Sequence, residues 1–180
     1  MKNWQNNVPG ESWASFGKVV FGVWLLVWLF AALHDRYLIH IHPEHFTVWH
    51  YQIPWIKDYT LLAIAYAFGA SVTPGLVLGV VLYVVSRLFN RPKMPTRKVF
   101  LGVLLVFVGL EISAITAGLI AWQTGREIYP EWLYPDTAPG LIITQSIQIT
   151  AYLSGLVLSA ILIGWIWIKR GQMAHLVFRD

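Results

Sequence analysis

The sequence predicts an all-α integral membrane protein with four transmembrane helices, and three observations lead to this fold class. Hydrophobic residues make up 57% of the 180 residues, charged residues make up only 12%, and the mean hydropathy is +0.57. A soluble domain carries about 25% charged residues. Four separate segments are also apolar, and the last three have at least the roughly 20 residues that a helix needs to cross a bilayer. We therefore expect residues 1–180 to form a single four-helix transmembrane domain.

The predicted spans follow from where the apolar runs begin and end. The first run, residues 19–33, is short, so the preceding residues are added to give a span. Lys2 precedes this run as in a cleavable signal peptide, but no small-residue cleavage site follows, so we expect the segment to be retained. The four predicted spans are 13–34, 61–86, 99–122 and 141–168.

The basic residues predict the orientation of these spans. Of the 13 Lys and Arg residues, all but Arg36, Lys57 and Arg126 fall on one side once the helices are drawn. Basic residues stay on the cytoplasmic side, so both termini are predicted to be cytoplasmic, most simply in a bacterial inner (plasma) membrane. The net charge of +4 comes from basic residues beside the membrane spans, where their usual role is to set orientation. No nucleic-acid partner is therefore predicted.

The segment between the first two spans is aromatic and rich in histidine. Five of the six histidines fall within residues 34–50, and imidazole is a common ligand of zinc, copper and iron. The alternatives are an amphipathic segment in the headgroup region and a pH sensor. The chain has no cysteine, which excludes iron–sulfur clusters and thiolate-ligated metals. The candidate metal ligands are His40, His42, His45, His50, Asp35 and Glu44.

Glu111 is the ionisable residue that falls deepest within a predicted span. An ionised carboxylate is costly in hydrocarbon, so such a residue is a functional candidate. At a matching depth, the second span carries Thr73 and the fourth carries Tyr152 and Ser154, all able to form hydrogen bonds. This intramembrane polar site fits a proton relay, a cation site, or a quinone or lipid contact. A protonated glutamic acid that only joins two helices fits equally well.

The outer end of the fourth span is polar. Gln145 and Gln148 share one sector there, and the loop before this span carries Glu127 and Glu131. Together these residues predict an outer vestibule for a neutral or weakly polar ligand. Helix capping and hydrogen bonds between helices are the simpler explanation of the same residues.

Small residues recur at intervals of four along the predicted helices. This spacing lets helix backbones approach closely in lipid, but it does not say whether the neighbour is in the same chain or in another subunit. The predicted packing positions are Gly75, Gly79, Ala114, Gly118, Gly155 and Ser159.

Three function classes remain. The first is a non-catalytic subunit or an assembly or accessory factor of a larger membrane complex, respiratory or metal-related, because the loops leave no room for a catalytic domain. Its partners would be the bilayer and other membrane subunits or further copies of the chain. The second is a metal-binding oxidoreductase or metal-handling protein using the histidines. The third is a small proton, ion or solute transporter using Glu111. Whether the protein is an enzyme stays open.

Overall fold

The structure, a computed structural model, describes residues 12–89 and 91–177, with side chains described up to residue 174. Four long helices dominate it: α1 (Trp13–Ile41), α3 (Tyr59–Arg87), α4 (Thr96–Thr124) and α5 (Pro139–Val177). A short helix α2 (Glu44–Thr47) and a 3₁₀ turn η2 (Glu131–Leu133) lie in the connections. Each long helix is long and apolar enough to cross a membrane, so the chain is an all-α integral membrane protein with four spans, as predicted.

The first helix extends seven residues beyond the predicted end at residue 34. The apolar-run criterion stops at the first polar residues, but the helix continues because Leu38 and Ile39 are fully buried. It ends at Ile41, before Pro43, and His42 is already in an extended conformation. Proline disfavours helical geometry in the residue that precedes it, which accounts for this boundary. The extension places His34, Asp35 and Tyr37 on a helix.

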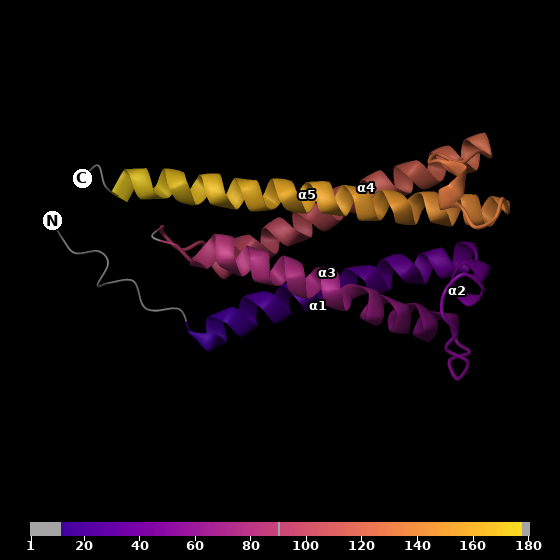
Figure 1. The fold of residues 1–180 in the computed structure, drawn as a ribbon, viewed down its shortest axis with the longest axis horizontal. Coiled ribbons are helices and arrows are strands. Elements are labelled where there is room, and N and C mark those ends of the chain that lie inside the picture. The colour runs from indigo at the N-terminus through magenta and orange to yellow at the C-terminus, as the bar shows by residue number, and fades with distance from the viewer. Residues whose placement is uncertain (1–11, 90, 178–180) are drawn as a thin grey trace.

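The bundle consists of two helix pairs. α1 packs chiefly on α3 and α4 packs chiefly on α5, with fewer contacts between the pairs (Figure 1). α1 begins and α5 ends at the same end of the bundle. We call this the basic end because Arg87, Arg91, Lys93, Arg97 and Lys98 lie in or beside the described part of the connection between α3 and α4 that it holds. The opposite, acidic end holds the connections 42–58 and 125–138 and the described carboxylates Glu44, Asp58, Glu127, Glu131 and Asp136.

Glycines make close packing within each pair possible. A Cβ atom at Gly79 would lie 2.7 Å from the backbone oxygen of Val20, and one at Gly75 would lie 3.0 Å from the Cα of Trp24. Gly118 and Gly155 likewise adjoin side chains across the α4–α5 pair, Ala114 is fully buried, and Ser159 is half-buried. The close approaches at these four glycines are therefore made within the chain.

The half of the bundle nearest the basic end has an apolar interior. Valine and leucine side chains from all four long helices fill it and leave no chain of polar groups along this stretch of the described residues. The fully or largely buried members of this cluster include Val19, Val20, Val23, Leu82, Val99, Val103, Val106, Leu162 and Ile166.

A buried arginine closes the basic end. Arg170 of α5 is fully buried and donates to backbone carbonyls at the end of α3 and in the loop that follows. Its Nε lies 2.7 Å from the oxygen of Pro92, and its Nη2 lies 2.8 Å from that of Leu88. The last carbonyls of a helix lack hydrogen-bond donors within the helix. The Arg170 guanidinium supplies these donors and so joins the two helix pairs.

Candidate functional site

Glu111 lies midway along α4 and is held by two side chains of α1. Its Oε2 lies 2.8 Å from Nδ1 of His34, and its Oε1 accepts a 2.7 Å hydrogen bond from the Tyr37 hydroxyl. His34 and Tyr37 are three residues apart and therefore share one face of the helix. Both carboxyl oxygens of Glu111 are thus engaged from a single turn of α1.

This pair can hold a proton in two arrangements. The proton can sit on His34, giving an imidazolium beside a carboxylate, or on Glu111, giving two neutral groups in contact. The Tyr37 hydroxyl lies 3.2 Å from His34 Nδ1 as well as donating to Glu111, so it contacts both members. Interconversion moves one proton across a 2.8 Å contact, which is the geometry that proton transfer requires.

His34 itself is not fully satisfied. Its side chain is 6% exposed, and its Nε2 has no hydrogen-bond partner within the described part of the chain. Asp35 beside it is 8% exposed and interacts electrostatically with His34. Buried polar groups are nearly always paired, so the Nε2 of His34 is an exception, which it shares among the described residues with the indole nitrogens of Trp24 and Trp28 and with Nε of Arg87.

Aromatic rings close this site toward the basic end. Phe30 lies one turn below His34, with ring centroids 5.7 Å apart. It stacks on Phe107, one turn below Glu111, with centroids 4.6 Å apart. Below this stack lies the apolar interior described above, so polar access from the basic end is blocked in this structure.

A second polar cluster lies toward the acidic end. His45 of α2 is 2% exposed, and its Nδ1 lies 2.9 Å from the Thr144 hydroxyl of α5. Its Nε2 bonds the amide oxygen of Gln148, whose amide nitrogen donates to the Tyr152 hydroxyl at 2.8 Å. An amide oxygen only accepts, so Nε2 of His45 carries the proton that faces Gln148.

Burial keeps this imidazole neutral. It lowers the pKa of His45 from 6.5 to about 4, against the opposing effect of the Gln148 hydrogen bond, while His50 and His42 lower it further. The charged form is disfavoured because the ring has left water. At neutral pH His45 is thus an uncharged link between α2 and α5.

Asp35 interacts electrostatically with residues of both clusters. It interacts with Tyr37 and His34 on one side and with Tyr152 on the other. No hydrogen bond among residues 12–89 and 91–174 joins the clusters directly. The half of the bundle nearest the acidic end therefore carries a discontinuous series of polar groups from His45 to Glu111.

An apolar groove reaches the same site from the lipid side. Its volume is about 470 Å³, and Tyr37 forms part of its wall. Ile115, one turn above Glu111, forms another part. The remaining lining residues are apolar side chains or glycine of α1, α4 and α5: Ile41, Gly118, Leu119, Trp122, Ile143 and Ile147.

The predicted metal ligands do not converge. No group of three histidine or carboxylate side chains suited to a metal ion occurs in the described residues. His40 bonds the Arg36 carbonyl, His42 lies 3.4 Å from Glu44, and His50 bonds the His45 carbonyl. His45 is committed to the contacts with α5, and Asp35 lies deeper in the bundle.

The other predicted sites are also dispersed. Thr73 is exposed on α3, and Ser154 bonds the Thr150 carbonyl of its own helix, so neither contacts Glu111. Gln145 donates to the Leu133 carbonyl, whereas Gln148 belongs to the His45 cluster. Glu127 is half-buried and Glu131 is exposed in the loop between α4 and α5.

Neither partner of Glu111 is among the site residues predicted from the sequence. The apolar-run criterion places His34 at the end of the first helix and Tyr37 beyond it, so neither is expected to face the bundle. Their three-residue spacing reveals a shared polar face only if the helix is extended toward Pro43.

Comparisons of the chain with protein-family models, with curated protein sequences and with solved structures found no match.

Proposed function

We propose that this protein is a proton-handling membrane subunit, in which the His34–Glu111 pair takes up and releases a proton within the bilayer. The observation that carries the proposal is the engagement of both carboxyl oxygens of Glu111 by His34 and Tyr37. A carboxyl and an imidazole in contact act as one coupled acid–base pair, so a proton can reside on either group.

Two features favour this role over a merely structural contact between helices. A structural contact is most stable when every buried polar group is paired. Here the Nε2 of His34 is buried without a partner among the described atoms, and the carboxyl group of Asp35 is largely buried beside it. Burial of these two polar groups lowers the stability of the folded protein, and their presence in spite of this cost supports a role in proton transfer.

The polar groups support exchange of this proton with the acidic end alone. The Phe30–Phe107 stack and the apolar interior lie on the other side. Toward the acidic end, Asp35 and the His45–Gln148–Tyr152 contacts offer polar positions that ordered water can join. One-sided access does not complete transport across a membrane. It fits a non-catalytic subunit that passes protons to or from a partner complex, the first of the function classes above.

The orientation is part of the proposal. The excess of lysine and arginine supports a cytoplasmic basic end, in a bacterial inner membrane, with both termini on that side. Since the chain has no cysteine, Trp132→Cys and Gln172→Cys each introduce a unique thiol, at the acidic and basic ends respectively. A membrane-impermeant maleimide added to intact cells should label the first and spare the second. The reverse pattern would refute this orientation.

Infrared difference spectroscopy on protein in lipid nanodiscs tests the proton site. Between about pH 4 and pH 10, a buried carboxyl band that belongs to Glu111 should appear or vanish; it should be absent in Glu111→Gln, shifted in Tyr37→Phe and retained in Asp35→Asn. Glu131→Gln, which removes an exposed carboxyl at the acidic end, should leave the band unchanged. A spectrum without any pH-dependent band that requires Glu111 would overturn the proposal.

The same band reports the side of access. In sealed vesicles with the acidic end outward, a step in external pH should change the band at once. In vesicles of opposite orientation, the change should await equilibration of the internal pH. An equal response in both preparations would show that access is not one-sided.

A second candidate function rests on the apolar groove beside Tyr37. A groove of about 470 Å³ open to lipid, with a tyrosine and a proton-sharing pair at its edge, suits the head of a lipid-soluble proton carrier such as a quinol. A short-tailed benzoquinone should then bind in detergent and protect the protein thermally. Leu119→Trp, which fills the groove, should abolish binding, whereas Leu156→Trp on an exposed face of α5 should not. Equal binding by both variants would reject this function.

A further inference from the structure

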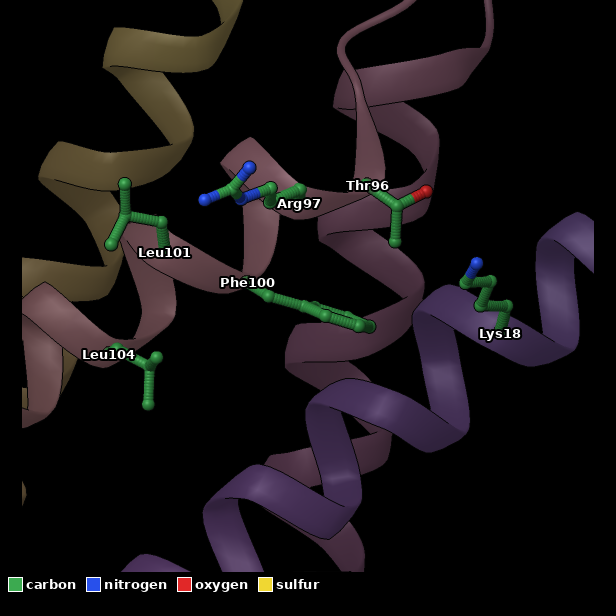
Figure 2. A pocket seen from close by; sticks show the side chains of 6 residues that line it. All are labelled: Lys18, Thr96, Arg97, Phe100, Leu101 and Leu104. Carbon is green, nitrogen blue, oxygen red and sulfur yellow. The ribbon is translucent and has the colours of Figure 1, made fainter.

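A pocket at the basic end combines positive charge with an apolar wall. It has a volume of about 410 Å³ and lies between α1 and α4 (Figure 2). Lys18 of α1 and Arg97 of α4 flank it, and Thr96 lies at its rim. Phe100, Leu101 and Leu104 of α4 form the apolar part.

The apolar part faces the hydrocarbon. Leu101 is 55% exposed and Leu104 is 46% exposed, which for a membrane helix means contact with lipid. The Phe100 ring reaches across to α1, where a Cβ atom at Gly22 would lie 2.5 Å from its Cζ atom. The pocket is therefore floored by an aromatic ring between two helices and open toward the acyl chains.

The positive charge at this pocket has no acidic counterpart among the described residues. Lys18 and Arg97 are exposed, and neither forms an ion pair there. Arg87 of α3 donates to the Thr96 hydroxyl at the rim, and its Nε is buried without a hydrogen-bond partner in the same set. Three cationic side chains from three helices thus approach one place, while the described carboxylates lie at the acidic end or near mid-membrane.

The depth of these charges matches the lipid headgroups. Arg97 lies in the first turn of α4 and Lys18 in the second turn of α1. A lysine side chain can extend along the helix toward the interface. The first amides of α4 add partial positive charge, since the cap residue Pro95 provides no side-chain acceptor for them.

We propose that this pocket binds an anionic phospholipid of the leaflet at the basic end. Its phosphate lies between Lys18 and Arg97, within reach of the Thr96 hydroxyl and Arg87, and one acyl chain runs along Phe100, Leu101 and Leu104. A basic pocket between helices at the membrane surface is the kind of site that recognises acidic headgroups. The lipid-facing leucines favour a phospholipid over free phosphate, because free phosphate gains nothing from an apolar wall.

Native mass spectrometry of the full chain in mild detergent tests the proposal with phosphatidylglycerol and phosphatidylcholine of matched acyl chains. One phosphatidylglycerol should remain bound at concentrations where phosphatidylcholine does not. The double variant Lys18→Gln/Arg97→Gln should weaken its binding roughly tenfold or more. The matched double variant Lys98→Gln/Lys169→Gln, with the same loss of charge at the same end but outside the pocket, should change binding less than about twofold.

Leu104→Trp separates a lipid site from a plain anion site. It fills the apolar wall and keeps every charge, so phospholipid binding should fall while the protein stays folded by circular dichroism. Equal loss in the two double variants, or equal retention of the two lipids, would overturn the proposal. It would also fail if Leu104→Trp binds normally and inorganic phosphate displaces the lipid. The single variant Lys18→Gln supplies the charge test if the double variant does not fold.

Discussion

Oε2 of Glu111 lies 2.8 Å from Nδ1 of His34, a residue 77 positions earlier in the chain, and this contact joins the two helix pairs. α1 otherwise packs chiefly on α3 and α4 chiefly on α5. Together with the Arg170 hydrogen bonds at the basic end, this polar contact sets the depth of one pair against the other. Glu111 therefore contributes to both assembly and chemistry, and the two contributions can be measured separately.

Tyr37→Phe should destabilise the protein modestly. It removes the 2.7 Å hydrogen bond to Glu111 Oε1 and leaves the contact between His34 and Glu111 in place. Hydrogen bonds between membrane helices are worth about 0.6 to 2 kcal/mol, so the free energy of unfolding should fall by about 1 kcal/mol. SDS titration of the detergent-solubilised protein measures it. Tyr59→Phe is the control, since the Tyr59 hydroxyl makes no hydrogen bond with a described residue, and a fall of equal size there would contradict the assignment.

Acid should destabilise the protein through His45. Its pKa is about 4 in the folded protein, against 6.5 for a histidine in water, so the unfolded chain binds the proton more readily between these values. Stability from this residue is complete above about pH 6.5 and declines as the pH falls toward 4, by up to about 3 kcal/mol. Unfolding midpoints measured across this window should fall more steeply for the wild type than for His45→Gln. Parallel curves would show that the imidazole titrates normally.

Removing the buried guanidinium at the basic end should be strongly destabilising. Arg170→Met leaves the carbonyls of Val85, Leu88, Arg91 and Pro92 without this donor. We expect a loss of about 3 kcal/mol, because buried acceptors lose hydrogen bonds to a charged group. Lys169→Met, one residue away and exposed, should change the free energy of unfolding by less than about 0.5 kcal/mol. Thermal unfolding in detergent compares them, and similar losses would disprove the role of Arg170.

Gly79→Ala should loosen the α1–α3 pair. The added methyl would lie 2.7 Å from the backbone oxygen of Val20 and 2.9 Å from its Cα, so no side-chain rotation relieves the clash. We expect a loss of about 1 to 3 kcal/mol, as for other overpacked sites. At Gly164 nothing described lies within 4 Å of the added methyl, so Gly164→Ala should leave stability unchanged or slightly raised. If the two substitutions behave alike, α1 and α3 are not in backbone contact here.

Local patterns in the sequence predict the spans but not their partners. Apolar runs identify all four helices because hydrocarbon imposes that composition residue by residue. The same criterion ends the first helix at residue 34, although His34 and Tyr37 lie on one continuous helix and contact Glu111. A polar residue that points into a bundle looks, in sequence, like one that leaves the membrane. Only the tertiary contact distinguishes the two.

In the histidine-rich segment, the candidate residues are visible in the sequence but their contacts are not. Its density of imidazoles is visible in the sequence, but the destination of each ring depends on how α2 meets α5. His45 is buried against Thr144 and Gln148, about 100 residues later, while His40 bonds its own helix. Composition therefore predicts which kinds of chemistry the histidines of this segment could perform. The fold determines which imidazole ring is placed to perform them.

The pairing of helices in sequence order has a consequence for biogenesis. α1 and α3 can insert and associate as a hairpin while α4 and α5 are still being synthesised. During that interval His34 and Tyr37 lie in the membrane without Glu111, the carboxylate that later holds them. The carbonyls that Arg170 binds likewise have no partner until α5 has been synthesised. The nascent first hairpin thus holds polar groups whose partners have not yet been synthesised. Membrane chaperones and quality-control proteases that recognise unpaired polar groups would act there, and a chain truncated before α4 would be their natural substrate.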